Sequence, residues 1–303
     1  MELLKQLCAI AAPSGDEGHM NEFLLDYIRK NNNKWKVQPE IYCGEDFQDC
    51  IVLIFGKPRT SIYAHIDNIG FTVRYSDQLV KIGGPHLKSG TKLVGQDSQG
   101  TVQCEVVIDD ENHLLYKGDR EIDRGTNLSY FPDWREDESS VQCCYMDNRL
   151  GVWNALKVCE TLENGAVVFS CWEEHGGGSV PYLSKFLIEK YGIRKALISD
   201  ITWITEGVHA GKGVVISMRD TGLPRRKFIN QIIEHAQKSG IPFQLEVEGS
   251  GGSDGTELQK QPYPIDWCFI GAAEENVHSP DEKVNKKDIT AMVDLYKYLM
   301  RVL

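Results

Sequence analysis

Seven histidine, aspartate and glutamate side chains lie where apolar strands are expected to end or helices to begin. In chain order they are His65 and Asp67, Asp147, Glu173 and Glu174, Asp200, and His278. Ligands of open α/β sheets bind beyond the carboxyl ends of the strands. Three of these five groups directly follow apolar runs with the pattern of strands, so we expect their side chains to meet at one edge of a sheet.

These residue types in this pattern predict a hydrolytic site with two metal ions. Imidazoles and carboxylates are ligands of zinc, cobalt or manganese. Two cations within roughly 3.5–4 Å need a shared anionic ligand, which Asp147 could supply. The Glu173-Glu174 doublet offers one carboxylate to a metal and an unligated one that accepts a proton from water. The His-x-Asp spacing lets Asp67 accept the free ring N–H of His65.

Each group also has an ordinary structural interpretation. A histidine after a strand is usually a polar loop residue, and an aspartate before a helix, such as Asp147, is usually an N-cap. Asp200 could cap a turn, and His278 could belong to an ordinary loop. Glu173 and Glu174 are harder to explain in this way, because they follow a buried apolar strand, where two carboxylates would repel each other without a cation.

The elements that must position these residues alternate between strands and helices. An early helix is indicated by the spacing of Phe23, Leu24, Tyr27 and Ile28, with Ser14 or Asp16 as its cap. Strands are expected at residues 36–43, 50–55, 60–65, 166–172, 195–199, 214–218, 243–247 and 265–270. Further helices are expected at residues 150–162, 181–191 and 224–238, and at the C-terminus, where one face carries Ile289, Met292, Val293 and Tyr296. This alternation predicts an α/β fold with a mostly parallel mixed sheet and helices on both faces.

Residues 68–142 have a different character. Helical periodicity is absent, and short alternating runs such as residues 102–108 are separated by glycines. The pattern predicts a small inserted β domain, a barrel. The expected division is therefore a catalytic domain made of residues 1–67 and 143–303, interrupted by the β domain of residues 68–142.

Composition excludes several classes of function. Of the 303 residues, 41% are apolar and 25% charged, which is typical of globular proteins. The net charge of 33 − 44 = −11 disfavours a general nucleic-acid partner. No apolar run is long enough to span a membrane, and the N-terminus lacks the pattern of a signal peptide. The nine cysteines form no Cys-x-x-Cys pair, which indicates reduced, mostly buried thiols in a cytoplasmic protein.

In order and local sequence, these groups resemble the M42 family of metallo-aminopeptidases, which includes the glutamyl and tetrahedral aminopeptidases. The similarity runs nearly end to end. It begins with an opening helix and the turn at residues 12–15. It continues through AHIDNIGF at 64–71, DNRLG at 147–151, Glu173-Glu174, Ser199-Asp200, GGSD at 251–254 and HSP at 278–280.

The resemblance implies a role for each residue. His65 and Asp200 would bind one metal, Glu174 and His278 the other, and Asp147 would bridge the two. Glu173 would be the general base, and Asp67 would orient His65. The cofactors would be two divalent ions, zinc in the first place and cobalt or manganese as alternatives. The family's zinc-peptidase-like fold carries an inserted β domain between the first two metal motifs, in agreement with the 147 − 65 = 82 residue interval here.

Some positions depart from the family pattern. Asn68 replaces a usual acidic residue, Asn148 replaces the second aspartate of an Asp-Asp-Arg motif, and His175 replaces a small apolar residue. None is an expected ligand, so the metal site is retained while the substrate preference is left open. A homo-oligomer fits the family, although the sequence alone does not establish a cage of twelve subunits.

The expected function is removal of N-terminal residues from peptides. One alternative is an M20-like N-acyl amidohydrolase or dipeptidase with the same metal ligands. In that class the first histidine and the bridging aspartate are close in sequence, and the 82-residue interval argues against it. The other alternative is a catalytically silent binding relative, which would have no reason to keep all seven side chains.

Overall fold

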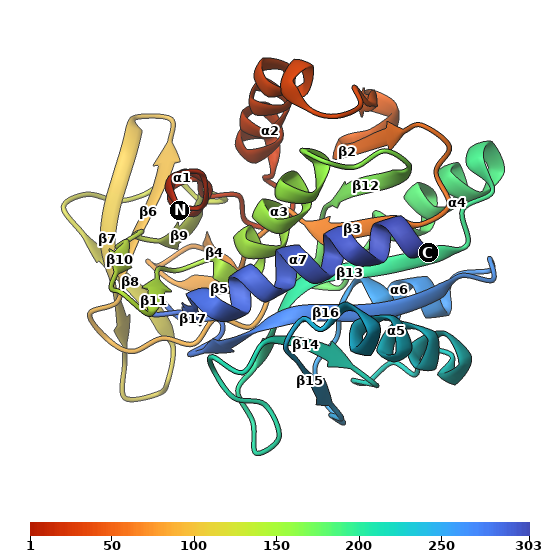
Figure 1. The fold of residues 1–303 in the computed structure, drawn as a ribbon. Helices are drawn as coiled ribbons and strands as arrows, with labels where there is room; N and C mark the ends of the chain where they lie inside the picture. The colour runs from red at the N-terminus through yellow and green to blue at the C-terminus, as the bar shows by residue number, and fades with distance from the viewer.

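The computed structural model describes residues 1–303 and contains two β-sheets (Figure 1). The larger sheet has 11 strands. Nine of them follow the spatial order β1 (Glu40–Gly44), β2 (Gln48–Phe55), β12 (Gly165–Ser170), β3 (Ser61–His65), β13 (Lys195–Trp203), β16 (Asp266–Glu275), β17 (Lys283–Asn285), β11 (Ser140–Gln142) and β10 (Arg135–Glu136). The other two are β14 (Val214–Ser217), which pairs with β16, and β15 (Phe243–Glu246), which pairs with β14.

The large sheet is mixed rather than mostly parallel. Its centre is parallel, with β12, β3, β13 and β16 side by side, and β14 is parallel to β15. The remaining neighbours are antiparallel. Short connections explain part of the difference, because a parallel crossover needs a dozen or more residues. Only residues 45–47 join β1 to β2, and only residues 276–282 join β16 to β17.

Seven α-helices accompany the sheets: α1 (Glu2–Cys8), α2 (Gly18–Asn31), α3 (Met146–Cys159), α4 (Val180–Tyr191), α5 (Arg226–Ser239), α6 (Asp254–Lys260) and α7 (Lys286–Val302). Helix α7 contacts α3 and α5, whereas α4 contacts α6. In Figure 1, α3 and α7 cross in front of the large sheet, and α6 lies behind β16. The predicted helices on both faces are therefore present. No helix in the chain combines the length and apolar character that a membrane crossing requires.

The apolar face predicted for the C-terminal helix is confirmed in α7, where Ile289, Met292 and Tyr296 are buried and Val293 is half-buried. The predicted cap of α2 is wrong. Neither Ser14 nor Asp16 caps that helix, which begins at Gly18 without a side-chain cap. The first predicted strand starts late, at Glu40, because a short 3₁₀ turn at Asn32–Lys34 precedes it.

The second sheet is antiparallel and has the strand order β5 (Leu79–Ile82), β4 (Gly70–Val73), β9 (Asn127–Tyr130), β6 (Lys92–Asp97), β7 (Gly100–Ile108) and β8 (Leu114–Gly118). It curls, and a single bridge between Gln78 and Leu115 links its two edges. The structure thus contains a curled six-stranded sheet, without the continuous edge pairing of the predicted barrel.

The two sheets share one hydrophobic core. A cluster of 77 buried residues includes Phe71 and Tyr130 from the second sheet together with residues of the large sheet and Tyr145. The rings of Tyr130 and Tyr145 stack with centroids 6.2 Å apart, and the Tyr145 hydroxyl donates to the Tyr130 carbonyl over 2.9 Å. All nine cysteines are free and only Cys43 is partly exposed, as predicted.

Candidate metal centre

The predicted ligands converge from five parts of the chain. His65 ends β3, and Glu174 lies in the 3₁₀ turn Glu173–His175 that follows β12. His65 pairs with Ser170, the last residue of β12, so the register places the two strand ends side by side. Asp200 lies within β13, which continues to Trp203. Asp147 comes from the first turn of α3, and His278 from the loop between β16 and β17.

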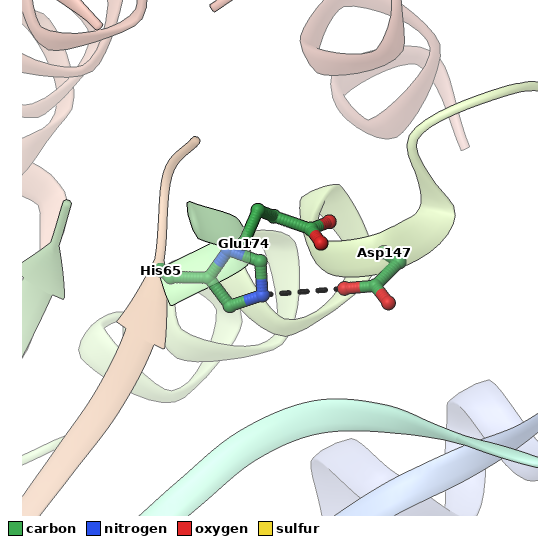
Figure 2. A group of neighbouring side chains, drawn as sticks. All are labelled: His65, Asp147 and Glu174. Atoms are coloured by element: carbon green, nitrogen blue, oxygen red, sulfur yellow. Dashed lines mark ion pairs between the residues drawn. The ribbon is translucent and has the colours of Figure 1, made fainter. Parts of the chain in front are cut away.

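Asp147 stands between the two imidazoles. Its Oδ1 lies 3.2 Å from Nε2 of His65, and its Oδ2 lies 3.3 Å from Nε2 of His278. Figure 2 shows Asp147 facing His65, with Glu174 beside them. Asp200 Oδ2 lies 3.6 Å from Nε2 of His65, and Glu174 Oε2 lies 3.1 Å from Nε2 of His278. The donor atoms therefore fall into two sets that share one carboxylate.

The spacing of these donor atoms fits metal coordination. Tetrahedral zinc with nitrogen and oxygen ligands at about 2.0–2.2 Å keeps neighbouring ligand atoms roughly 3.3–3.6 Å apart. The four distances here run from 3.1 to 3.6 Å. Ligand atoms of His65, Asp147 and Glu174 all lie within 4.8 Å of one another, and Oε1 of Glu174 is buried without a hydrogen-bond partner. The residues present thus suit two small divalent cations.

The electrostatics of the cluster favour bound cations. Burial would lower the pKa of His278, but hydrogen bonds to Asp147 and Glu174 raise it to about 12. Burial likewise opposes the charge on His65, yet Asp200 and Asp147 raise its pKa well above the ordinary value. Burial and neighbouring carboxylates raise the pKa of Asp200 well above the usual range. Positive charge is therefore favoured here, and metal ions can supply it in place of protons.

Asp67 connects the first histidine to the glutamate doublet. The side chain is fully buried, and Oδ1 lies 3.3 Å from Nδ1 of His65, an ion-pair distance without hydrogen-bond alignment. Its oxygens accept the backbone N–H groups of Glu173 and Glu174 over 3.2 and 3.1 Å. The hydroxyl of Ser14 donates to Oδ2 over 2.7 Å. Asp67 thus fixes the turn that carries both glutamates as well as facing the imidazole.

Glu173 lies farther from the imidazoles than the other carboxylates of the cluster. Its Oε2 is 4.0 Å from Nε2 of His65, whereas Asp147, Asp200 and Glu174 lie 3.1 to 3.6 Å from an imidazole nitrogen. The carboxylate lines a cavity of about 300 Å³ together with Asp147, Glu174, Asp200 and His278. Burial raises the pKa of Glu173 well above its ordinary value, with further contributions from Glu174 and Asp254 against the opposing effect of His65.

Two glutamates were not predicted from the sequence. Glu282 is buried and accepts the backbone N–H of Asp147 over 3.2 Å and that of His278 over 2.9 Å. Glu274 is also buried, and neither of its carboxylate oxygens has a hydrogen-bond partner. Burial raises the pKa of both carboxyls well above the usual range. In the sequence they lie four residues before and after His278. Glu274 directly follows an apolar run at residues 267–273, a signal like that of Glu173-Glu174, whereas Glu282 lies in a polar loop without such a signal.

The two asparagines that depart from the family pattern take structural roles. Oδ1 of Asn68 accepts from the backbone N–H of Ala12 and from the guanidinium of Arg149, a fully buried side chain. Arg149 also donates to the carbonyls of Ile66 and Ile10. Asn148 donates to the Ser199 carbonyl over 2.9 Å. These bonds hold the segments next to His65, Asp147 and Asp200.

The second sheet holds the loop that carries His278. The hydroxyl of Tyr130, the last residue of β9, donates to the His278 carbonyl over 3.2 Å. The backbone N–H of His86 donates to the same carbonyl over 2.8 Å. The backbone of the His278 loop is therefore held by Tyr130 of the six-stranded sheet and by His86 as well as by Glu282.

Comparisons with known proteins identify the family of this chain. The model of the M42 glutamyl aminopeptidase family matches residues 103–295. A putative aminopeptidase from Acetivibrio thermocellus is 24% identical over 325 residues, which cover 97% of this chain and 96% of that protein.

Three solved structures have the same fold. Aminopeptidase APDkam598 from the archaeon Desulfurococcus kamchatkensis has a TM-score of 0.87 at 19% identity, covering 100% of this chain and 94% of its own. A TET aminopeptidase from Thaumarchaeota archaeon SCGC AB-539-E09 also scores 0.87, at 17% identity, with 100% and 97% covered. The Pyrococcus horikoshii TET1 peptidase, which can assemble into a tetrahedron or a large octahedral shell, scores 0.82 at 20% identity, with 99% and 98% covered.

Proposed function

Because this chain belongs to the M42 peptidase family, we propose that its peptide hydrolase activity is that of a two-metal aminopeptidase, which releases N-terminal residues from peptides. One observation carries the two-metal part of the proposal. The two oxygens of the Asp147 carboxylate each lie within 3.3 Å of a different imidazole, the position that a ligand shared by two cations must take.

The donor atoms divide into two ligand sets. His65 and Asp200 hold one ion, Glu174 and His278 hold the other, and Asp147 binds both. Imidazole and carboxylate donors suit zinc, with cobalt and manganese as alternatives. When bound, two such ions lower the pKa of a water molecule and polarise the carbonyl of the scissile peptide bond.

Glu173 acts as the general base. It borders the cavity, its carboxylate accepts no hydrogen bond, and Asp67 fixes its backbone N–H, so Oε2 is free to receive a proton from water. The same carboxyl then gives that proton to the leaving amine. Burial raises the pKa of Glu173 well above its ordinary value, which makes the carboxylate a better proton acceptor.

Asp67 acts as a positioning residue. Facing Nδ1 of His65, it favours the tautomer that leaves Nε2 free to bind metal. Residues 68–142, which contain the six-stranded sheet, are proposed as the inserted domain between His65 and Asp147. A homo-oligomer is proposed because the chain covers 98% of a relative that assembles into closed shells, and light scattering after gel filtration tests this.

The first experiment measures release of N-terminal residues from a panel of aminoacyl-p-nitroanilides and short peptides. Protein is stripped with a chelator and then reloaded with zinc, cobalt or manganese. The expected result is release that disappears on stripping and returns with metal, together with two ions per chain by elemental analysis. A folded, metal-loaded chain without release from any member of the panel contradicts the proposal and directs testing to N-acyl substrates.

A further inference from the structure

The cavity beside the proposed metal centre continues past the metal-binding residues into an acidic end. Its volume is about 300 Å³, and its lining includes the carboxylates of Asp220, Glu246 and Glu248 besides those of the metal ligands and Glu173. The lining contains no lysine or arginine. These three residues come from the β14–β15 region, which no step of the proposed reaction uses.

Two of these carboxylates are buried and lack a cation partner. Glu246 is 4% exposed, and Asp220 is 7% exposed. One oxygen of Glu246 accepts from the Thr202 hydroxyl, and one oxygen of Asp220 accepts the Gly222 N–H over 2.5 Å. The hydroxyl of Ser217 also lies close to Glu246 and favours its charged form. The donors that contact the two carboxylates are therefore neutral, and neither carboxylate forms a salt bridge.

The charge of Arg219 favours the ionised form of the neighbouring Asp220, but the two side chains form no salt bridge. Nε of Arg219 donates to the main-chain carbonyls of Asp220 and Glu248, over 3.0 and 3.1 Å. Arg219 does not line the cavity and lies beyond 4.0 Å of any carboxylate oxygen. Burying an unpaired carboxylate is unfavourable unless a cation or further donors meet it. Burial, with Glu248 and Asp220 nearby, raises the pKa of Glu246, so a positive group entering the cavity would be drawn to this end.

Three apolar side chains also line the cavity, although most of its lining is polar. Ile201, Trp203 and Phe269 are the hydrophobic lining residues, and the Trp203 ring packs beside Gly251 at the cavity rim. Lysine and arginine side chains have this combination of an apolar stem and a charged end. An exposed indole can also attract a cation at its face.

We propose that Asp220 and Glu246 form the end of the pocket for the substrate's N-terminal side chain and select peptides that begin with lysine or arginine. The inference rests on the proposed aminopeptidase function, because the metal centre places the scissile bond at the other end of the cavity. It also implies that N-terminal glutamate is disfavoured, although the matching family model is described as glutamyl aminopeptidase. A glutamate side chain would add a carboxylate to a pocket without a cation.

The sharpest test compares lysyl- and norleucyl-p-nitroanilide on the metal-loaded wild-type protein. The two substrates differ only in the terminal ammonium group. The expected kcat/KM is higher for lysine by about tenfold or more, the size of one charge-assisted hydrogen bond, with glutamate the poorest of the panel. Equal or faster release of norleucine, or preferred release of glutamate, overturns the selectivity but leaves the aminopeptidase proposal standing. Absence of release from every substrate contradicts the aminopeptidase proposal itself.

Two variants test whether Glu246 and Asp220 cause the preference for lysine. Glu246→Gln and, separately, Asp220→Asn are expected to lower kcat/KM for the lysyl substrate about tenfold while the norleucyl value stays within about twofold. The exposed Glu206 supplies the matched control, because Glu206→Gln makes the same chemical change outside the cavity. An unchanged lysine-to-norleucine ratio in both cavity variants contradicts the assignment. If one variant fails to fold, the other and the wild-type ratio still decide.

Discussion

The two ends of the cavity contain the same kind of side chain in different surroundings. At the metal end, carboxylates alternate with two imidazoles, and Asp147 touches both histidines. At the acidic end, Asp220 and Glu246 have neither an imidazole nor a salt bridge, and only neutral donors contact them. On the two proposals made above, the metal end uses its nitrogen and oxygen donors to hold transition-metal ions, whereas the acidic end meets the charged side chain of the substrate. Four changes sharpen or break this contrast.

The largest effect is expected from removing the shared ligand. Asp147→Ala deletes the only carboxylate that contacts both histidines, so both ions should be lost. Turnover should then fall by at least about 10⁴-fold, since each tenfold corresponds to about 1.4 kcal/mol of lost transition-state stabilisation. Elemental analysis and kcat/KM measure this change, with Asp133→Asn at an exposed loop as control. Retention of two ions per chain would refute the bridging role.

Glu173→Gln separates proton transfer from metal binding. The amide cannot accept a proton, and we expect kcat to fall about 10²–10⁴-fold while the protein keeps two ions per chain. Loss of an ion together with activity would instead make Glu173 a ligand. The matched change Glu174→Gln should behave in that second way, because Glu174 lies 3.1 Å from Nε2 of His278.

Asp67→Asn tests whether the charge of Asp67 positions His65 for metal binding. The amide oxygen can still accept one backbone N–H, but the charge facing Nδ1 of His65 is removed. We expect metal affinity to weaken about 10–100-fold, as is typical when the partner of a metal-binding histidine is lost. Titration with a metal indicator measures the affinity, and excess metal should restore most of the turnover. A variant that stays inactive at saturating metal would show that Asp67 acts mainly through Glu173.

The smallest effect should appear at the acidic end, in stability. The folded-state pKa of Glu246 is raised by burial, so the folded protein holds this proton more tightly than the unfolded chain. Stability from this group is therefore present below about pH 4.5 and is lost as the pH rises through the raised value. Glu246→Gln should be neutral or stabilising by about 1 kcal/mol or less at pH 7. Denaturant unfolding at pH 5 and pH 8, with metal held constant, tests the sign, and a strong destabilisation only at pH 8 would contradict it.

The sequence predicts the metal end better than the acidic end for a physical reason. His65 and Glu174 follow apolar runs that form neighbouring parallel strands, and parallel strands present their carboxyl ends at one edge. Asp147 and His278 come from a helix start and a loop, which no strand pattern places at that edge. The chemistry of a two-metal site suggested Asp147 as the shared ligand, whereas only the family resemblance gave His278 a role. Asp220 and Glu246 reach the cavity through the pairing of β14 with β15 and β16, a long-range register without a local sequence signal.

Features of the fold that depend on long-range contacts are likewise not predicted from local sequence patterns. The alternation of strands and helices predicts the parallel centre of the large sheet, but the antiparallel neighbours depend on how short each connection is. Serine is a preferred N-cap residue, yet the hydroxyl of Ser14 donates to Asp67, which lies more than fifty positions away in the sequence. Glu282 has no apolar neighbours that would mark it as buried, because it follows Pro280 and Asp281 in a polar loop.

The bond between the Tyr130 hydroxyl and the His278 carbonyl has a consequence for how the protein is made. It joins positions 148 residues apart in the sequence. The ring of His86 contacts the Val277 carbonyl of the same loop, 191 residues away. Contacts of such large sequence separation form late in folding, since the chain between them must first be ordered. Under the two-metal proposal, the ligand set that contains His278 can therefore assemble only after nearly the whole polypeptide has been synthesised. Until then, the newly synthesised chain carries its peptide-cleaving residues in an unassembled form.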